Sequence, residues 1–568
     1  MNKVFKVIWN HATQTWTAVS ELGHAKGKTK SKKVAVMTLS AVAGAVIGTV
    51  SLTQDAMAAA SYGNSAVNIS PDAYNGSNSV GKNSVVVGYQ NTADDNWGTT
   101  AIGANNTAIA NSALAVGNNN KATAGAATAL GVSNNASGEA SVAIGNLANA
   151  TMIRTVAIGN NANAKNVNAT AIGDRANALG QDTVAIASRT EATSHLAIAI
   201  GKQAASNSGL RPGIDKQGDN DKESSTVAIG AFSEATPGSQ TVYDGSAGKI
   251  GNGYTQNGDG SWSSPIGTAL AAVAIGDHAK AKRDGAVGLG NSAKALGDNS
   301  VAIGSFPGGK GATNANSIAI GTSTTSTGMS SIAMGGGSQA THDQAIAVGR
   351  TAKATKEDAT AIGYNAAASK NNATAIGREA AASADNATAI GREAVASADN
   401  AVAQGAAAKA TGTASFAGGT SANASGANAI AIGGAMEAAK AAQAIGDYAI
   451  AQGYNATSQK QSDIAIGTNA AANGTDTPAG SSTGQNAGTA ISIGANSVAT
   501  GIATTALGQA AQATKNGAVA VGSLANATNK AAAAFGRDSN ASGESSTALG
   551  SGAKASANYS FAASVNAN

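Results

Sequence analysis

Two successive stretches of the chain differ at a single position: Asn372-Ala-Thr-Ala-Ile-Gly377-Arg-Glu-Ala-Ala-Ala-Ser383 and Asn386-Ala-Thr-Ala-Ile-Gly391-Arg-Glu-Ala-Val-Ala-Ser397. They are offset by 14 residues. The residues that close each Ala-Ile-Gly-like triplet keep this phase over four runs, from Gly103 to Gly201, from Gly276 to Gly304, from Gly321 to Gly433 and from Gly494 to Gly550. A low-complexity chain would not hold one phase over so many units, so the repeat defines the fold.

Each repeat unit has the pattern of two short strands joined by two tight turns. Thr374 and Ile376 lie two residues apart, so they share one face of a strand, and both are β-branched. Gly377 then turns the chain, and Ala380 and Ala382 form a second alternating pair. We therefore predict an all-β, parallel solenoid of flat 14-residue coils, in which Ile376 and its equivalents point into the stack.

The predicted stack is long and thin. Parallel pairing at roughly 4.8 Å per layer gives about thirty coils a length on the order of 140 Å. A buried Ala contributes much less than a buried Ile, so the Ala half of each coil is a weak core. We therefore expect a single rod to be marginally stable, and its Ala-lined flat faces to pack against identical rods in an obligate homo-oligomer.

Three segments interrupt the phase, at about 202–226, 231–271 and 468–490. Insertions in solenoids emerge as surface loops and often lie on a binding face. Trp262, in the second segment, is a candidate ligand-binding residue because aromatic side chains make up only 3% of the chain. Neutral surface decoration is the alternative for all three segments.

The region before the repeats has the features of an export signal. We divide it into residues 1–33 and 34–60, with the repeat region at 61–568. A basic run from Lys26 to Lys33 is followed by the apolar stretch Val34–Leu52 and by the small residues Ala56 to Ala60. This is the order of a cleaved secretory signal. A membrane anchor is the alternative for the apolar stretch.

Composition excludes several classes of partner and chemistry. The chain has no Cys, which excludes disulfides, Cys-based zinc sites and thiol chemistry. The formal net charge of +4 comes from seven Lys within the first 60 residues, beyond which there are 29 basic and 30 acidic residues. Binding to nucleic acid needs a concentrated basic face, so we expect no nucleic-acid partner.

No catalytic motif is convincing. His195, His278 and His342 are dispersed, and we expect no enzyme activity, no cofactor and no metal site. One open alternative is a polysaccharide-active solenoid, whose charged residues would be the stacked Arg378, Glu379, Arg392 and Glu393. The other is a purely structural or ice-binding rod, which the scattered Thr residues do not favour.

Two segments of the chain resemble a known family. The unit Asn299-Ser-Val-Ala-Ile-Gly-Ser305, with Asn316-Ser-Ile-Ala-Ile-Gly321 and the 14-residue phase, resembles the head of trimeric autotransporter adhesins of the YadA-like type. The start of the chain, about 33 residues, resembles the extended signal peptide region of Gram-negative autotransporters. The resemblance implies a left-handed parallel β-roll, a homotrimer, and export to the cell surface or outer membrane.

The same resemblance implies adhesion to host extracellular matrix proteins such as collagen, or to cells, together with autoagglutination. In that family the heptapeptide pattern is linked to collagen binding, which makes the candidate ligand-binding residues Asn299, Ser300, Val301, Ala302, Ile303, Gly304 and Ser305. The family head is normally followed by a stalk and a membrane anchor, but here the 14-residue pattern runs to Ser564. We therefore expect the stalk and anchor to be absent, and the chain to be a truncated reading frame or a fragment.

Overall fold

The computed structural model describes residues 5–10, 15–20, 67–69, 79–80, 83–93, 97–206, 226–236, 249–250, 254–256, 262–263, 271–474 and 489–567. The chain divides into two compact units, Met1–Ser61 and Tyr62–Asn568. In the first unit, β1 (Phe5–Asn10) and β2 (Thr15–Ser20) pair as an antiparallel hairpin. The described residues include no helix long and apolar enough to cross a membrane.

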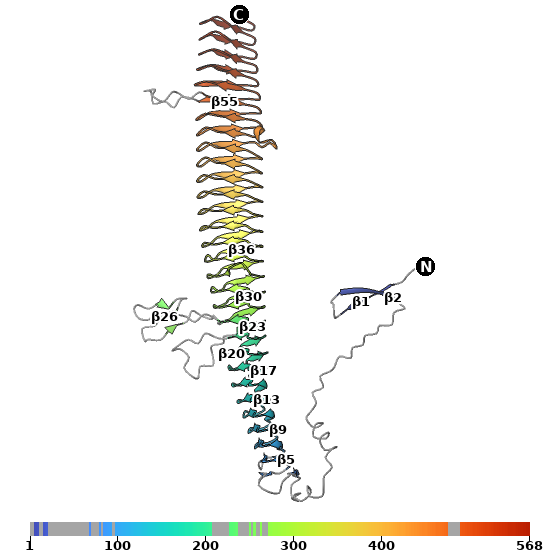
Figure 1. The fold of residues 1–568 in the computed structure, drawn as a ribbon. Coiled ribbons are helices and arrows are strands. Elements are labelled where there is room, and N and C mark those ends of the chain that lie inside the picture. The colour runs from blue at the N-terminus through green and yellow to red at the C-terminus, as the bar shows by residue number, and fades with distance from the viewer. Residues whose placement is uncertain are drawn as a thin grey trace. The chain divides into compact units, whose positions relative to one another are not determined.

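The second unit is a stack of coils, each with two short strands (Figure 1). β42 (Thr374–Ile376) and β43 (Ala381–Ala382) belong to one coil, and β44 (Thr388–Ile390) and β45 (Val395–Ala396) belong to the next. β42 pairs in parallel with β44, and β43 pairs in parallel with β45, both in the register of the 14-residue repeat. The predicted all-β parallel solenoid is therefore confirmed.

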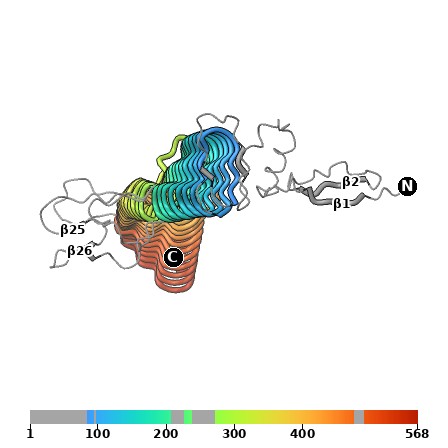
Figure 2. Tube along the Cα trace, turned by 90° about the horizontal axis from the view of Figure 1, so that it is seen from below, coloured from blue at the N-terminus to red at the C-terminus, as the bar shows by residue number. Residues whose placement is uncertain are grey.

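Repetition of this pairing builds two parallel sheets. Sheet 1 runs from β3 (Val67–Ile69) to β66 (Phe561–Ala563), and sheet 2 runs from β4 (Ser79–Val80) to β65 (Lys554–Ala555). Most sheet 1 strands have three residues and most sheet 2 strands have two. The sheet 1 strands of five residues are β5 (Val85–Tyr89), β7 (Thr100–Ala104), β9 (Leu114–Asn118), β11 (Thr128–Val132), β13 (Val142–Asn146) and β15 (Val156–Asn160). Seen along the stack, successive coils lie one behind another (Figure 2).

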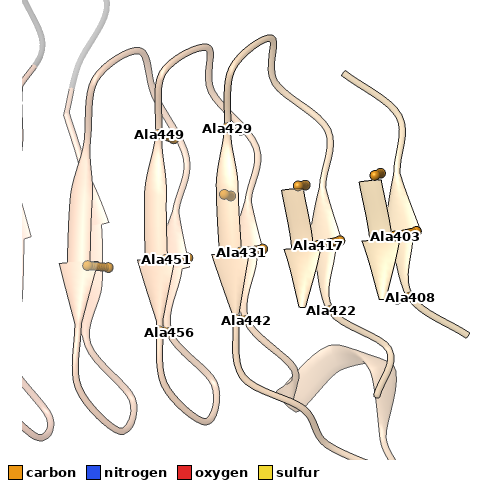
Figure 3. Close-up of a cluster of buried hydrophobic side chains, with 14 of the residues drawn as sticks. Ala403, Ala408, Ala417, Ala422, Ala429, Ala431, Ala442, Ala449, Ala451 and Ala456 are labelled. Atoms are coloured by element: carbon orange, nitrogen blue, oxygen red, sulfur yellow. The ribbon is translucent and has the colours of Figure 1, made fainter. Parts of the chain in front are cut away.

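The core between the two sheets consists mainly of alanine, with Ser, Thr and Asn at some of the inward positions. Ala373, Ala375, Ala380 and Ala382 are fully buried, and the same positions are filled by Ala in most other coils (Figure 3). The prediction that Ile376 points into the stack is wrong, because Ile376 alternates with buried Ala375 and lies on the outer, partly exposed face of sheet 1. The predicted Ala-lined outer faces are wrong for the same reason. Most of the larger apolar side chains are directed outward because the close spacing of the two sheets favours small inward side chains, although Val86 and Phe306 are buried.

Two turns close each coil. Turn 1 follows the sheet 1 strand; Gly377 has φ +134° there and Glu379 has φ +58°. Turn 2 follows the sheet 2 strand and ends at Asn386, with φ +57°. Each turn hydrogen-bonds to the same turn of the preceding coil; the Glu379 N–H, for example, donates to the Tyr364 carbonyl at 2.8 Å. The two turns therefore form two opposite edges along the stack.

All three long interruptions leave the stack from the turn 2 edge. The described chain stops at Ser206, Thr236 and Gly474, each just after a sheet 2 strand, and resumes at the start of the next sheet 1 strand. The first residues of each predicted insertion therefore still belong to coils, in β22 (Ala205–Ser206), β24 (Glu234–Ala235) and β55 (Ala471–Asn473). Among the described residues, turn 1 carries two short additions, one between β32 (Val301–Ile303) and β33 (Gly311–Ala312) and one with the single-turn 3-10 helix Ala438–Lys440.

Candidate ligand-binding and assembly surfaces

The outer face of sheet 1 is a largely apolar stripe two side chains wide. Ile303, Ile390 and Leu549 expose 36%, 38% and 48% of their surfaces. The outward pairs along the middle of the stack are Val287 and Leu289, Val301 and Ile303, Ile318 and Ile320, Ile332 and Met334, Ile346 and Val348, and Thr360 and Ile362. Soluble monomers rarely expose apolar patches of this extent, so the stripe marks a contact surface.

Unusual pairs on this stripe conserve its volume. In β48 (Phe416–Gly418) the large side chain comes first and the second position is Gly. A Cβ placed on Gly418 would lie 2.8 Å from Phe416 Cε1, so the ring covers the space of the missing side chain. In β62 (Ala533–Phe535) the order is reversed, with the small residue first. Such compensation between the two positions is what close packing at a contact surface requires.

The outer face of sheet 2 is polar and carries a row of hydroxyl groups. Backbone hydrogen bonds from each row member to the next coil keep the row in register; the Ser369 N–H, for example, donates to the Ala382 carbonyl at 3.0 Å. Nine consecutive coils contribute Thr313, Thr327, Thr341, Thr355, Ser369, Ser383, Ser397, Thr411 and Ser425. The interpretation that Thr is scattered is therefore wrong for this face, because threonines far apart in sequence align once the coils stack.

The predicted heptapeptide site does not form one patch. Ser300 and Ala302 are buried inside the coil, and Val301 and Ile303 lie on the outer face of sheet 1 in β32 (Val301–Ile303). Asn299 sits at turn 2, where its Nδ2 donates to Asn316 Oδ1 at 3.5 Å. Gly304, with φ +130°, and Ser305 form turn 1 at the other end of the strand.

Trp262 lies in a small hairpin within the second insertion. β27 (Trp262–Ser263) pairs antiparallel with β26 (Tyr254–Gln256), which also pairs with β25 (Lys249–Ile250). The Trp262 side chain lies outside the described residues, and its role stays a prediction.

The stacked charges proposed for an enzyme pair with each other inside each coil. Arg378 contacts Glu379 at 3.0 Å and Arg392 contacts Glu393 at 2.8 Å, all four on the exposed turn 1 edge. The hydrogen bonds that Arg378 donates to the Glu379 carboxylate, together with the negative charge of that carboxylate, raise the pKa of Arg378 above its ordinary value. These contacts form an exposed ladder of ion pairs.

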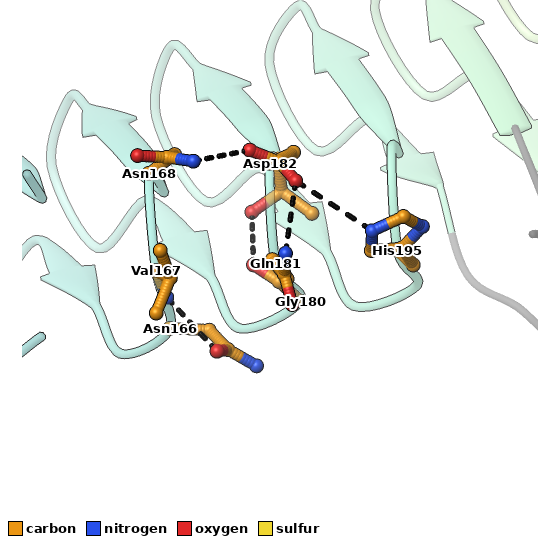
Figure 4. Close-up of polar contacts among 8 residues, drawn as sticks. Asn166, Val167, Asn168, Gly180, Gln181, Asp182 and His195 are labelled. Carbon is orange, nitrogen blue, oxygen red and sulfur yellow. Dashed lines mark hydrogen bonds and ion pairs between the residues drawn. The ribbon is translucent and has the colours of Figure 1, made fainter. Parts of the chain in front are cut away.

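The three histidines stay dispersed in the folded chain. His195 Nε2 lies 3.6 Å from Asp182 Oδ2, and Asp182 Oδ1 accepts a hydrogen bond from Asn168 of the coil before (Figure 4). His278 pairs with Asp277 at 2.9 Å on the opposite edge. Within the described ranges, no three His, Cys, Asp or Glu residues group closely enough to hold a metal ion.

One buried carboxylate, that of Asp463, was not identified from the sequence. Asp463 is fully buried at an inward position, where other coils carry Ala, Ser or Thr. It accepts hydrogen bonds from the backbone N–H groups of Lys460, Gly474 and Ala490 at 3.0, 2.9 and 2.8 Å. Burial raises the pKa of Asp463 above its usual value, although these backbone bonds lower it. The carboxylate therefore joins the two ends of the third insertion to the coil.

Comparisons with known proteins agree with this architecture. The profile of the extended signal peptide of the type V secretion system matches residues 1–49. The profile of the YadA head domain repeat (two copies) matches over more than half of the chain, at residues 79–106, 122–148, 150–186, 284–306, 312–435, 444–477, 499–525 and 527–563. No curated protein matches the chain. A secretion signal of this type and a stack of head repeats together mark an exported cell-surface protein of the adhesin type, and the chain belongs to the trimeric autotransporter adhesins with YadA-type heads.

Proposed function

We propose that this chain forms the head of a homotrimer on the outer membrane of a Gram-negative bacterium. In this proposal the head binds host extracellular matrix proteins or cell surfaces, and copies on neighbouring cells bind one another. The observation that carries the proposal is the apolar outer face of sheet 1, which only another large apolar surface can cover.

Identical copies are the partners that best fit this face. The stripe follows the full stack, so its partner must be equally long and must present apolar groups with the same coil spacing. Another copy of sheet 1 satisfies both conditions. Three copies arranged around an axis would bury the stripe of each copy in a common interior and would supply the large side chains that the alanine core of one coil lacks.

Ligand contacts would then fall on the surfaces that assembly leaves open. Val301 and Ile303 would be covered by partner copies, so a collagen-like ligand would meet the heptapeptide only through Asn299 and Ser305. Shallow sites repeated along the coils of three chains give avidity without a deep pocket.

The assembly is tested with two variants that place charge on the same two coils, one on the outer face of sheet 1 and the other on the outer face of sheet 2. We expect the variant Ile376→Glu with Ile390→Glu to reduce the mass of the purified chain, measured by light scattering, from three copies towards one. The matched control is Ala381→Glu with Val395→Glu, on the outer face of sheet 2, which should keep the mass of the unsubstituted chain. A monomeric unsubstituted chain, or equal effects of both variants, would refute the assembly.

Adhesion is tested by binding of the purified chain to immobilised collagen, fibronectin and laminin, to host cells and to itself. We expect binding to at least one of these surfaces. If collagen is bound, Asn299→Ala with Ser305→Ala should weaken that binding, and the distant pair Thr468→Ala with Ser551→Ala is the control. Absence of binding to every surface would overturn the adhesive role.

A further inference from the structure

Between residues 343 and 400 both edges of the stack are densely charged. The turn 1 edge carries Arg350, Arg378 and Arg392, one coil apart except where Tyr364 intervenes, with the Arg350 guanidinium 5.9 Å from the Tyr364 ring centre. The turn 2 edge carries five exposed carboxylates, from Asp343, Glu357, Asp358, Asp385 and Asp399, against two exposed lysines, Lys356 and Lys370. The two rows lie at the same levels of the stack but on opposite edges.

The turn 2 carboxylates have no cationic partner within the described chain. Each of the seven ion pairs found there uses other acids. Three of the five are nevertheless held in place by single backbone bonds: Asp343 accepts from the Met329 N–H at 2.8 Å, and Asp385 and Asp399 accept at 3.2 Å from the N–H groups of the coil before. They are thus fixed, exposed and free to accept further bonds.

The same coils have the weakest apolar stripe. Three consecutive coils place Thr360, Thr374 and Thr388 at the first outward position of sheet 1, where neighbouring coils carry Val or Ile. The next coil places Gln404 at the second outward position. Contact through sheet 1 alone would therefore be weaker here than elsewhere along the rod. None of the three long insertions interrupts the turn 2 edge in this segment.

A closed ring of copies brings the two edges together. When flat coils surround an axis with the same face inward, turn 1 of each copy meets turn 2 of the next copy at the same level, a contact that repeats around the ring. We propose that the arginines of turn 1 form ion pairs with the turn 2 carboxylates of the adjacent copy, and that these pairs hold the trimer in register where its apolar stripe is weakest. This inference rests on the trimer proposed above and adds the residues that align it.

The short pairs inside each coil do not prevent this exchange of partners. Arg378 and Arg392 expose 59% and 57% of their side chains, and exposed ion pairs of this kind contribute little. A guanidinium has five N–H donors, so it can keep its neighbouring glutamate and also bind a second carboxylate.

Charge reversal with rescue tests the inference on the full chain. One variant carries Arg378→Glu with Arg392→Glu, a second carries Asp385→Arg with Asp399→Arg, and a third carries all four changes. Within one chain, Arg378 and Asp385 lie at opposite ends of a sheet 2 strand, on the order of 20 Å apart. Any rescue in the third variant must therefore act between copies. Lys353→Glu with Lys409→Glu, on the outer face of sheet 2, is the matched control.

Mass photometry on dilution, at about 0.05 M and about 1 M salt, gives the dissociation constant of the assembly. We expect each double reversal to raise this constant at least about tenfold at low salt, with a smaller effect at high salt. The fourfold variant and the lysine control should lie within about twofold of the unsubstituted chain. An intact trimer with unaffected double variants, or a fourfold variant as weak as the two doubles combined, would overturn the edge contacts and leave the sheet 1 assembly standing. A monomeric unsubstituted chain would overturn both.

Discussion

Near the start of the stack, a ladder of buried asparagines allows us to predict the cost of removing one of its side chains. Asn91, Asn106, Asn120 and Asn134 occupy the same inward position in four consecutive coils and are all fully or almost fully buried. The Asn120 Nδ2 donates to the carbonyls of Val116 and Gly131 at 2.9 and 2.7 Å. Its Oδ1 accepts from the backbone N–H of Asn134 at 3.1 Å and from the Asn134 side chain at 2.8 Å.

We expect Asn120→Ala to destabilise the coils around it by about 2–6 kcal/mol. The change leaves two buried backbone groups, the Asn134 N–H and the Gly131 carbonyl, without these partners, and each such loss costs about 1–3 kcal/mol. Because coils contact only their neighbours, the effect should stay local and should not shift unfolding of the whole rod.

Hydrogen exchange of the Asn134 backbone N–H measures this local opening. A cost of about 2 kcal/mol corresponds to roughly thirtyfold faster exchange. Asn118→Ala removes the same side chain two residues away, at an exposed position of turn 1, and should leave exchange unchanged. Equal protection of the Asn134 amide in the two variants would refute the ladder as a source of stability.

Two further substitutions separate the roles of particular positions. Gly377→Ala should disrupt its coil, because φ is +134° and the added Cβ would lie 2.4 Å from the Gly391 carbonyl oxygen. Gly336→Ala should be tolerated, because no neighbouring atom lies closer than 3.9 Å to the added Cβ. Equal protection from hydrogen exchange in the substituted coils of the two variants would contradict this. Asp463 should make the coil that carries it less stable as pH rises. Its pKa is raised, so the folded coil binds the proton more tightly than the unfolded chain, and this stabilisation is present below the ordinary value of 3.8 and lost as pH rises through the raised pKa. Protection of the Ala490 backbone amide from hydrogen exchange, corrected for intrinsic exchange, should therefore fall between pH 3.5 and neutral pH. Asp463→Asn should abolish this pH dependence. If the pH dependence survives in the variant, Asp463 is not its source.

The repeat period predicted the fold because it fixes pairing directly. A 14-residue phase places like residues side by side in consecutive coils, and a glycine such as Gly377 marks the turn whose backbone other residues avoid. These conclusions depend only on the spacing of residues along the chain, which can be read from the sequence alone.

The direction of the side chains was not predictable from alternation alone. Ile376 and Ala375 alternate equally well with either one inside, and preferring the larger apolar residue for the core gave the wrong answer. The deciding signal was size: the positions equivalent to Ala375 and Ala382 are filled almost only by Ala, Ser or Thr, as expected where two backbones lie close together. Asp463 gave no such signal, because its role depends on where an insertion rejoins the stack.

The placement of small side chains inside the coils and of larger apolar side chains outside links the fold to the proposed function. A core of methyl groups buries little apolar area per coil, and the branched side chains that would normally fill a core remain outside on sheet 1. In the proposed trimer other copies would bury these side chains, and stability would then be a property of the assembly. If sheet 1 is occupied in this way, Val301 and Ile303 cannot also bind a ligand, and binding is left to sheet 2, to the turn edges and to the insertions that leave from turn 2. A substitution that abolishes adhesion without changing assembly should accordingly map to those surfaces and never to the sheet 1 stripe.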